Sequence, residues 1–237
     1  MKKLTFLFFF LLSSHFLFAQ ETSAYNNFKK WSYGITVGGT SNFRILTSDG
    51  SENFLKDDKN STEIRRTSFT AGMVANYRIT DVLSINSGLA YDELGFKTRE
   101  QILSYSDGTN ISASTAYHYR YVTAPLDLKY DFLKKICWNL YVGGGVSPAV
   151  FIGEATVFNY GGSKNNDSQP VGFDRFNFAG DLRAGADYWI ADNIKLTAGL
   201  YYKQFLNATN SNLPTKAYLN SAGLTAGFIY MRRKKHK

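Results

Sequence analysis

The chain has 237 residues, of which 16% are aromatic and 20 are Gly, with only 4 Pro and a single Cys. One Cys excludes an internal disulfide framework. The formal net charge of +8 is no evidence for a nucleic-acid-binding face, because two lysines lie at the amino terminus and five basic residues lie among the last six.

The amino terminus has the order of a secretory signal peptide. Lys2 and Lys3 precede a mainly apolar stretch from Leu4 to Phe18, and Ala19 supplies a small residue for cleavage. A membrane anchor is the alternative, but the apolar run is shorter than the ~20 residues that a membrane-spanning helix needs. We expect residues 1–19 to be removed and residues 20–30 to form a short periplasmic segment.

Eight segments then alternate apolar residues with small or polar residues at period two, as in β-strands with two different faces. They cover residues 31–38, 69–79, 83–89, 117–132, 138–150, 178–188, 194–200 and 222–230. No apolar run after residue 19 approaches the length of a membrane helix. A β-barrel is the other structure that spans lipid with every backbone group paired.

The connections between these segments alternate in length. Short turns are expected at residues 80–81, 133–136 and 191–193, and long polar loops near residues 44–67, 99–115, 153–176 and 206–216. In an up-and-down barrel, all short turns share one end. The predicted fold is therefore all-β: an eight-stranded antiparallel up-and-down transmembrane β-barrel over residues 31–231 in a Gram-negative outer membrane. Its long loops are expected outside the cell, and its termini, including a basic tail at residues 232–237, in the periplasm.

Pro125 interrupts the fourth segment and removes a backbone donor, so we expect a bulge or bend there. Residues 126–132 alternate clearly, whereas the alternation of residues 117–124 leaves their two faces unassigned.

If the apolar positions face lipid, the charged positions face the lumen. An eight-stranded barrel has an interior just wide enough for side chains to fill, so these charges should pair as a polar plug. The predicted lumen network comprises Arg78, Asp127, Lys129, Asp181, Arg183, Asp187 and Lys195. A narrow conducting pore is one alternative. A soluble lipocalin-like barrel with an apolar, ligand-binding pocket is another, because alternation alone does not say which face is outside.

Aromatic residues gather where each strand should cross a membrane interface, as in the girdles of outer-membrane barrels. The predicted periplasmic girdle comprises Trp31, Tyr77, Tyr130, Trp138, Tyr188 and Tyr230. The predicted outer girdle comprises Phe69, Tyr91, Phe151, Phe178 and Tyr202.

The segments Tyr121–Tyr130 (YVTAPLDLKY) and Leu140–Pro148 (LYVGGGVSP) resemble the middle strands of the PorT-like outer-membrane β-barrel family, which is common in Bacteroidetes. The resemblance extends by pattern over the whole mature chain. It implies an outer-membrane barrel, and the family's founding member is associated with the type IX secretion machinery. The family supplies no catalytic motif. This chain departs from it by continuing past Tyr230 into a basic tail.

No residue pattern predicts catalysis, a cofactor or a metal site. His118 is the one plausible base for a lipid-modifying enzyme, with Ser104, Ser106, Ser112 and Ser114 in the adjoining segment. Cys137 and His118 should lie near opposite ends of the barrel, which excludes a shared metal. Gly143–Gly145 lacks the Lys-Ser or Lys-Thr of a phosphate loop, so close packing is the expected reason for these glycines.

These patterns favour a binding, scaffold or assembly role through the long loops over an enzyme or a pore. The expected partners are outer-membrane lipids, the barrel assembly machinery and a surface or secretion-system protein, with no nucleic acid.

Overall fold

The computed structural model describes residues 28–48, 50, 53–106, 108–161, 163–167, 173–210 and 215–233. The predicted signal peptide, most of the predicted periplasmic segment and residues 234–237 of the predicted tail lie outside the described residues. No helix in the described ranges is long and apolar enough to cross a membrane.

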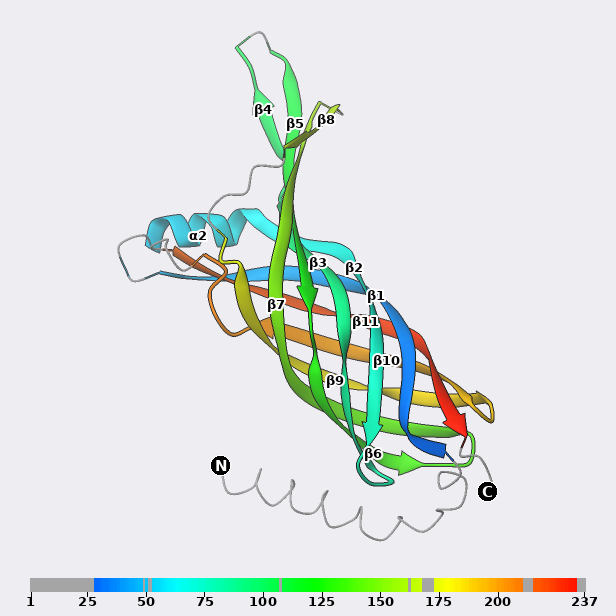
Figure 1. Cartoon of the computed structure of the whole chain (residues 1–237). Helices are drawn as coiled ribbons and strands as arrows, with labels where there is room; N and C mark the ends of the chain where they lie inside the picture. The colour runs from blue at the N-terminus through cyan, green and yellow to red at the C-terminus, as the bar shows by residue number, and fades with distance from the viewer. Residues whose placement is uncertain are drawn as a thin grey trace, which may run out of the picture.

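The described chain is almost entirely antiparallel strand, with one short helix (Figure 1). The elements are β1 (Phe28–Ser48), α2 (Asn53–Thr62), β2 (Glu63–Arg78), β3 (Leu83–Thr98), β4 (Gln101–Ser104), β5 (Asn110–Thr123), β6 (Leu126–Lys134), β7 (Trp138–Tyr160), β8 (Ser163–Asp167), β9 (Phe176–Ala191), β10 (Ile194–Phe205) and β11 (Thr215–Arg233). In the described part of the chain, eight wall strands close a ring when β5 and β6 are counted as one. The predicted eight-stranded antiparallel barrel is confirmed.

β5 and β6 are two halves of one wall strand that is broken at Ala124 and Pro125. Thr123 pairs with Ala90 on β3, and the ladder resumes at Leu126, which pairs with Ser87. The expected irregularity at Pro125 is confirmed. Tyr121 and Thr123 before the break are buried, as are Asp127 and Lys129 after it, so odd-numbered residues point inward on both sides.

The three short turns join β2 to β3, β6 to β7, and β9 to β10, as predicted, and all lie at one end of the barrel (Figure 1). We call this the turn end and the opposite end the mouth. Phe28 at the start of β1 pairs with Arg233 at the end of β11, so the described chain begins and finishes at the turn end.

The predicted extents of three long loops are wrong, because the strands continue well past the apolar wall. β1 continues to Ser48 and β2 begins at Glu63, with α2 between them. β5 and β7 stay paired from Thr123 and Ala149 out to Ala113 and Tyr160. β4 adds to β5 and β8 adds to β7, so a four-stranded blade, β4-β5-β7-β8, projects from the mouth (Figure 1).

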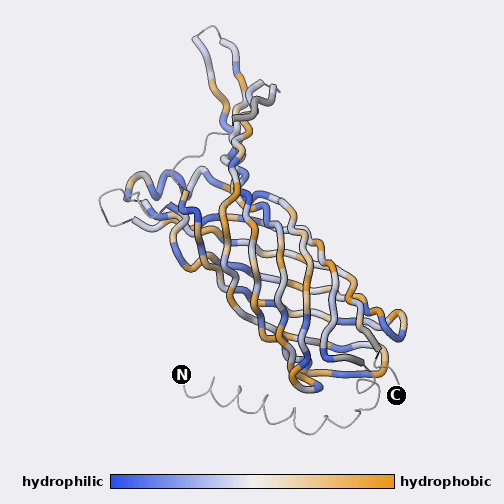
Figure 2. The backbone as a smooth tube through the Cα atoms, in the orientation of Figure 1, coloured by the Kyte–Doolittle hydropathy of each residue, from blue (hydrophilic) through white to orange (hydrophobic). Residues whose placement is uncertain are grey.

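The two faces of the wall differ sharply in polarity. Ile35, Val37 and Leu200 are about 60% exposed on the outside, whereas Asp127 and Asp187 are buried inside. Hydrophobic and hydrophilic positions accordingly alternate along the wall strands (Figure 2). An apolar exterior around a charged interior is the arrangement of a membrane barrel. The lipocalin-like alternative, which requires an apolar pocket inside, is wrong.

Candidate functional site

The lumen nearest the turn end holds a cluster of lysines around one buried carboxylate. Nζ of Lys129 lies 2.6 Å and Nζ of Lys195 lies 2.5 Å from the same Asp187 oxygen. Asp131 lies 3.8 Å from Lys129 and 3.9 Å from Lys134. Removing one partner from such a group leaves a buried charge uncompensated. We call these five residues the turn-end cluster.

A middle cluster follows toward the mouth. Nζ of Lys203 lies 2.5 Å from Asp92 and 3.8 Å from Asp181. The Ser147 hydroxyl also donates a hydrogen bond to Asp181. These contacts join strands on different sides of the barrel, so the side chains fill the lumen.

Glycines on β7 give the charged side chains room to meet across that strand. Arg183 on β9 lies 3.1 Å from Asp127 on β6, with β7 between them. Gly145 pairs with Asp127, and a Cβ on this glycine would lie 2.7 Å from Asp127 Oδ1. Any side chain at position 145 therefore displaces the ion pair. This contact is consistent with the close-packing role expected for Gly143–Gly145.

The structure brings four of the seven sequence-predicted lumen residues, Asp181, Lys129, Asp187 and Lys195, into these two clusters, and it pairs two others, Asp127 and Arg183, with each other. The seventh, Arg78, lines a cavity at the turn end together with Lys129 and Lys195. Sequence reasoning missed Asp92 and Lys203, both nearly fully buried. Extending the β3 and β10 alternation by a few residues would have found them, because they share the inward parity of Asn86 and Lys195.

Nearer the mouth, the lumen is closed by packed apolar and aromatic side chains. The buried members are Leu94, Phe96, Tyr119, Tyr121, Ala149, Ala179, Phe205 and Leu219. The Tyr121 ring meets the rings of Phe205 and Phe151 edge-on at centroid distances of 5.0 and 5.4 Å. Phe173 stacks on Phe151 at 5.2 Å. We call this group, with Phe151 and Phe173, the aromatic plug.

The prediction that Phe151 belongs to the outer girdle is wrong. It shares the inward parity of Ser147 and Ala149 and packs in the aromatic plug. The other girdle residues have outward parity. Trp31, Phe69, Tyr130, Trp138, Phe178, Tyr188 and Tyr230 are exposed, and Tyr77, Tyr91 and Tyr202 are half-buried. Trp31 packs on Tyr77 and Phe69 packs on Tyr91, with ring centroids 4.9 and 5.6 Å apart.

Arg66, Glu93 and His118 form a partly buried group at the mouth. The group lies beyond the exposed apolar side chains that surround the barrel wall. Nδ1 of His118 lies 2.7 Å from Glu93 and 2.6 Å from the Arg66 guanidinium, which also pairs with Glu93. Burial lowers the pKa of His118, and nearby Arg66 and Arg120 lower it further, against the opposing effect of Glu93. Burial alone would raise the pKa of Glu93, but hydrogen bonds from Arg66 and His118 outweigh it and lower that pKa.

Among the described residues, no serine or threonine hydroxyl is hydrogen-bonded to His118. Two serines of the adjoining segment have hydrogen-bond partners elsewhere: the Ser104 hydroxyl donates to Asn110, and that of Ser112 donates to Glu100. The ring nitrogen of His118 is engaged by Arg66 and Glu93. The geometry therefore gives His118 a role in the ion-pair network of the mouth.

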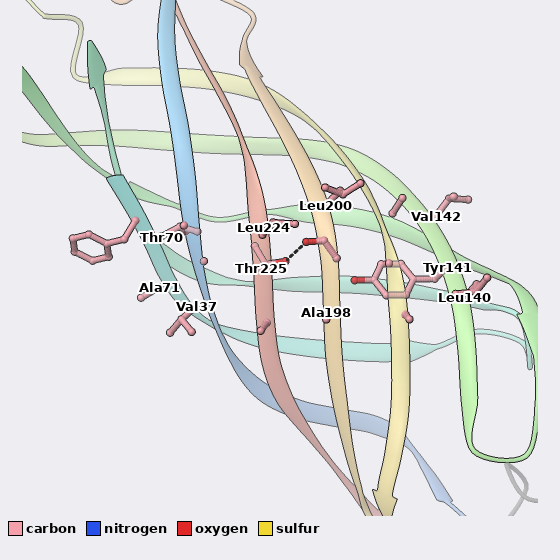
Figure 3. A pocket seen from close by; sticks show the side chains of 18 of the residues that line it. Val37, Thr70, Ala71, Leu140, Tyr141, Val142, Ala198, Leu200, Leu224 and Thr225 are labelled. Carbon is pink, nitrogen blue, oxygen red and sulfur yellow. Dashed lines mark hydrogen bonds between the residues drawn. The ribbon is translucent and has the colours of Figure 1, made fainter. Parts of the chain in front are cut away.

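The outer wall carries a shallow apolar recess of about 990 Å³ (Figure 3). Ala186, Ala198 and Ala226 are cross-strand partners in one row on β9, β10 and β11. Larger side chains, including Val37, Leu140 and Leu200, surround them. This surface fits the hydrocarbon chains of surrounding lipid.

Among the described residues, no group of three or more His, Cys, Asp or Glu side chains is arranged to hold a metal ion. Cys137 is exposed in the turn between β6 and β7, and His118 lies on the mouth half of β5.

Comparison with protein families gives one match: the model of the family described as "Outer membrane protein beta-barrel domain" covers residues 18–209. A comparison with curated protein sequences finds no match. Among solved structures, the chain is similar to Neisserial surface protein A (17% identity, TM-score 0.46, covering 85% of this chain and 97% of that one). It is also similar to OprG from Pseudomonas aeruginosa (13% identity, TM-score 0.46, covering 88% and 99%).

Proposed function

Because this chain belongs to the outer membrane protein beta-barrel domain family, we propose that it is a binding or scaffold component of the outer membrane. The observation that carries this proposal is the blade, a four-stranded sheet that projects beyond the mouth of the barrel (Figure 1). Recognition usually resides on segments that a rigid scaffold holds away from its core.

The blade exposes apolar side chains on a polar ribbon. All four side chains of β4 are exposed, and Ile102 is 72% exposed. On β7, Phe158 and Tyr160 are also exposed, and the Tyr160 hydroxyl lies 2.5 Å from that of Tyr105. In the described residues β4 pairs only with β5, so its other edge presents unpaired backbone groups. An exposed edge with apolar side chains suits the addition of a strand from another protein.

The filled lumen supports a non-conducting role. The turn-end and middle clusters and the aromatic plug occupy successive levels between the turn end and the mouth. Opening a path would require breaking ion pairs that are almost fully buried, which is costly. In planar lipid bilayers the protein should therefore give no discrete conductance steps, and the appearance of such steps would favour the narrow pore instead.

The resemblance of Tyr121–Tyr130 and Leu140–Pro148 to PorT-like barrels supports a more specific proposal, that the blade's partner belongs to a surface or secretion assembly. The proposed orientation is the one expected from the loop lengths: the mouth and blade face the exterior and the turn end faces the periplasm. In this proposal the signal peptide is removed after export, and the barrel assembly machinery inserts the mature chain among outer-membrane lipids.

Site-specific photo-cross-linking in living cells tests the binding role. A photoreactive residue at Ile102 or Phe158 should give an adduct of one defined mass with the same partner. Phe54 on α2, which is 86% exposed, is the matched control and should give no such adduct. Adducts of equal yield at all three positions, or none on the blade, would contradict a partner-binding blade.

A further inference from the structure

The blade has two edges, formed by β4 on one side and by β8 on the other (Figure 1). In the described part of the chain β4 pairs only with β5, and β8 pairs only with β7. Natural proteins protect such edges with charged residues, prolines or bulges, because an unprotected edge accepts a strand from another chain. The residues of each edge strand therefore show whether that edge is built to stay free.

The two edges differ in this protection. β8 has the sequence Ser-Lys-Asn-Asn-Asp, with a charged residue of each sign. β4 has the sequence Gln-Ile-Leu-Ser, with no charged residue and no proline, and its register with β5 is continuous. Glu100 immediately precedes β4, but its carboxylate accepts a hydrogen bond from the Ser112 hydroxyl on β5 and is thereby directed back toward the blade. β4 is therefore the unprotected edge.

The hydrogen-bond pattern of the β4–β5 hairpin shows which backbone groups face the free edge. The N–H of Tyr105 donates to the Thr109 carbonyl, so these two residues form a hydrogen-bonded pair across the hairpin. Hydrogen-bonded pairs alternate with non-hydrogen-bonded pairs along an antiparallel ladder. The next residue of β4 in a hydrogen-bonded pair is therefore Leu103. The N–H and C=O groups of Ile102 and Ser104 point away from β5, toward the open edge.

The far side of β5 agrees with this assignment. Ser112 pairs with Ile102, yet its carbonyl accepts a hydrogen bond from the N–H of Gly161, at the end of β7. That carbonyl therefore points away from β4, as a non-hydrogen-bonded pair requires. The outward donors and acceptors of Ile102 and Ser104 are thus the groups that a fifth strand would use.

The side chains at this edge favour an uncharged, apolar occupant. Ile102 and Leu103 are 72% and 38% exposed, and as neighbours on a strand they point to opposite faces of the blade. Leu103 shares its face with Tyr105, whose hydroxyl contacts that of Tyr160. A strand along the edge would cover Ile102 on one face and Leu103 on the other. A charged residue opposite either side chain would lose water without gaining a partner, which is costly.

We propose that the free edge of β4 binds a short extended segment of the partner protein, uncharged and with two adjacent apolar residues, as a fifth strand of the blade. The segment bonds to the outward backbone groups of Ile102 and Ser104, and its apolar residues cover Ile102 and Leu103. The backbone bonds supply affinity, and the two apolar contacts supply specificity. This inference rests on the proposed binding role of the blade and adds the edge and the kind of segment that this role uses.

Photo-cross-linking from Phe158 on β7 in living cells tests the edge, because that position reports the partner without altering β4. Two edge variants are combined with the photoreactive residue. Ile102→Lys places a charge at the edge, and Ser104→Pro removes an outward N–H while keeping the N–H groups that bond to β5. Each should lower the yield of the partner adduct by about fivefold or more, as expected for a desolvated charge or a lost hydrogen bond.

The matched controls make similar changes that leave the edge intact. Ser114→Lys adds the same charge to the same face of the blade but on the inner strand β5, and Ser104→Ala keeps the outward N–H. Both should give the adduct yield of the parent protein, and every variant should keep the gel mobility of the folded barrel. Should Ser104→Pro open the β4–β5 hairpin, Ile102→Lys alone decides, because it changes only an exposed side chain.

The outcomes separate this inference from the proposed binding role. No adduct from Phe158 in the parent protein contradicts the binding role and this inference with it. An adduct at full yield in the edge variants leaves the binding role standing and overturns strand addition. With the photoreactive residue at Leu103, mass spectrometry should map the contact to an uncharged segment with adjacent apolar residues. A charged segment, or an adduct of twice the chain's mass that identifies a second copy, would overturn the proposal.

Discussion

Lys203 on β10 crosses the lumen to Asp92 on β3, and its Nζ lies 2.5 Å from a carboxylate oxygen although 111 residues separate the two in sequence. Both side chains are at least 96% buried. Thr70 and Thr123 donate hydrogen bonds to the same carboxylate from neighbouring strands. This pair therefore ties opposite walls of the barrel together.

Replacing Lys203 with Met should destabilise the folded barrel by about 3–5 kcal/mol, because Asp92 is left buried without its counter-charge. The measurement is the midpoint of thermal unfolding. It is followed by gel electrophoresis, as the loss on heating of the faster-migrating band that the folded barrel gives. Lys216→Met, at an exposed position, is the control and should cost within about 0.5 kcal/mol. Equal stability of the two variants would show that the pair does not hold the barrel together.

Gly95→Ala should destabilise the mouth by about 1–3 kcal/mol. Gly95 has φ of +140°, and an added Cβ would lie 1.9 Å from the Tyr117 carbonyl oxygen, so the side chain brings both strain and a clash. Gly153→Ala is the control, since a Cβ there meets nothing within 4 Å. Amide hydrogen exchange in residues 93–97 should accelerate in the first variant only, and unchanged protection in both would contradict this reading.

Acidification should weaken the group formed by Arg66, Glu93 and His118. The pKa of His118 lies below 6.5 in the folded state. As the pH drops below about 6.5, His118 therefore binds a proton more readily in the unfolded state than in the folded state, and the stability of the fold decreases. The pKa of Glu93 lies below 4.5, so its contribution is lost as pH falls further. The unfolding midpoint should therefore drop between about pH 7.5 and about pH 4, and less so in the Glu93→Gln, His118→Gln double variant. If the unfolding midpoint fell equally with pH in the parent protein and the double variant, His118 and Glu93 would not be the source of this pH dependence.

Phe151→Ala should cost about 3 kcal/mol, because it opens a cavity inside the aromatic plug. Phe178→Ala removes the same ring from the lipid-facing surface, where lipid chains fill the space, and should cost distinctly less. The comparison uses the same heat-modifiable gel migration. A larger loss of stability in Phe178→Ala than in Phe151→Ala would contradict the placement of Phe151 in the aromatic plug.

The sequence predicts the membrane wall well because lipid and lumen impose opposite polarities on alternate residues. That rule identifies Asp127, Lys129 and Asp187 as inward residues. It does not apply to the blade, where both faces of β4 and β5 meet water, so residues 99–115 give no strand pattern and suggest a loop.

Contacts between distant strands were beyond sequence reasoning. The partners of Lys203 follow from the order and stagger of the strands around the ring, which alternation does not determine. The grouping of His118 with Arg66 depends on a register shift in β2 between Arg65 and Thr70. A shift of that kind changes which side chains meet without leaving a mark in the local pattern.

Labelling with a membrane-impermeant maleimide on intact cells tests most directly whether the chain is a membrane-spanning barrel with the blade outside the cell. The chain's own Cys137 is exposed in a turn-end loop, and Ile102→Cys in a Cys137→Ala background places a thiol on the blade. The blade thiol should react on intact cells, and Cys137 should react only after the outer membrane is permeabilised. Reaction of Cys137 on intact cells, with a protected residue 102, would contradict it.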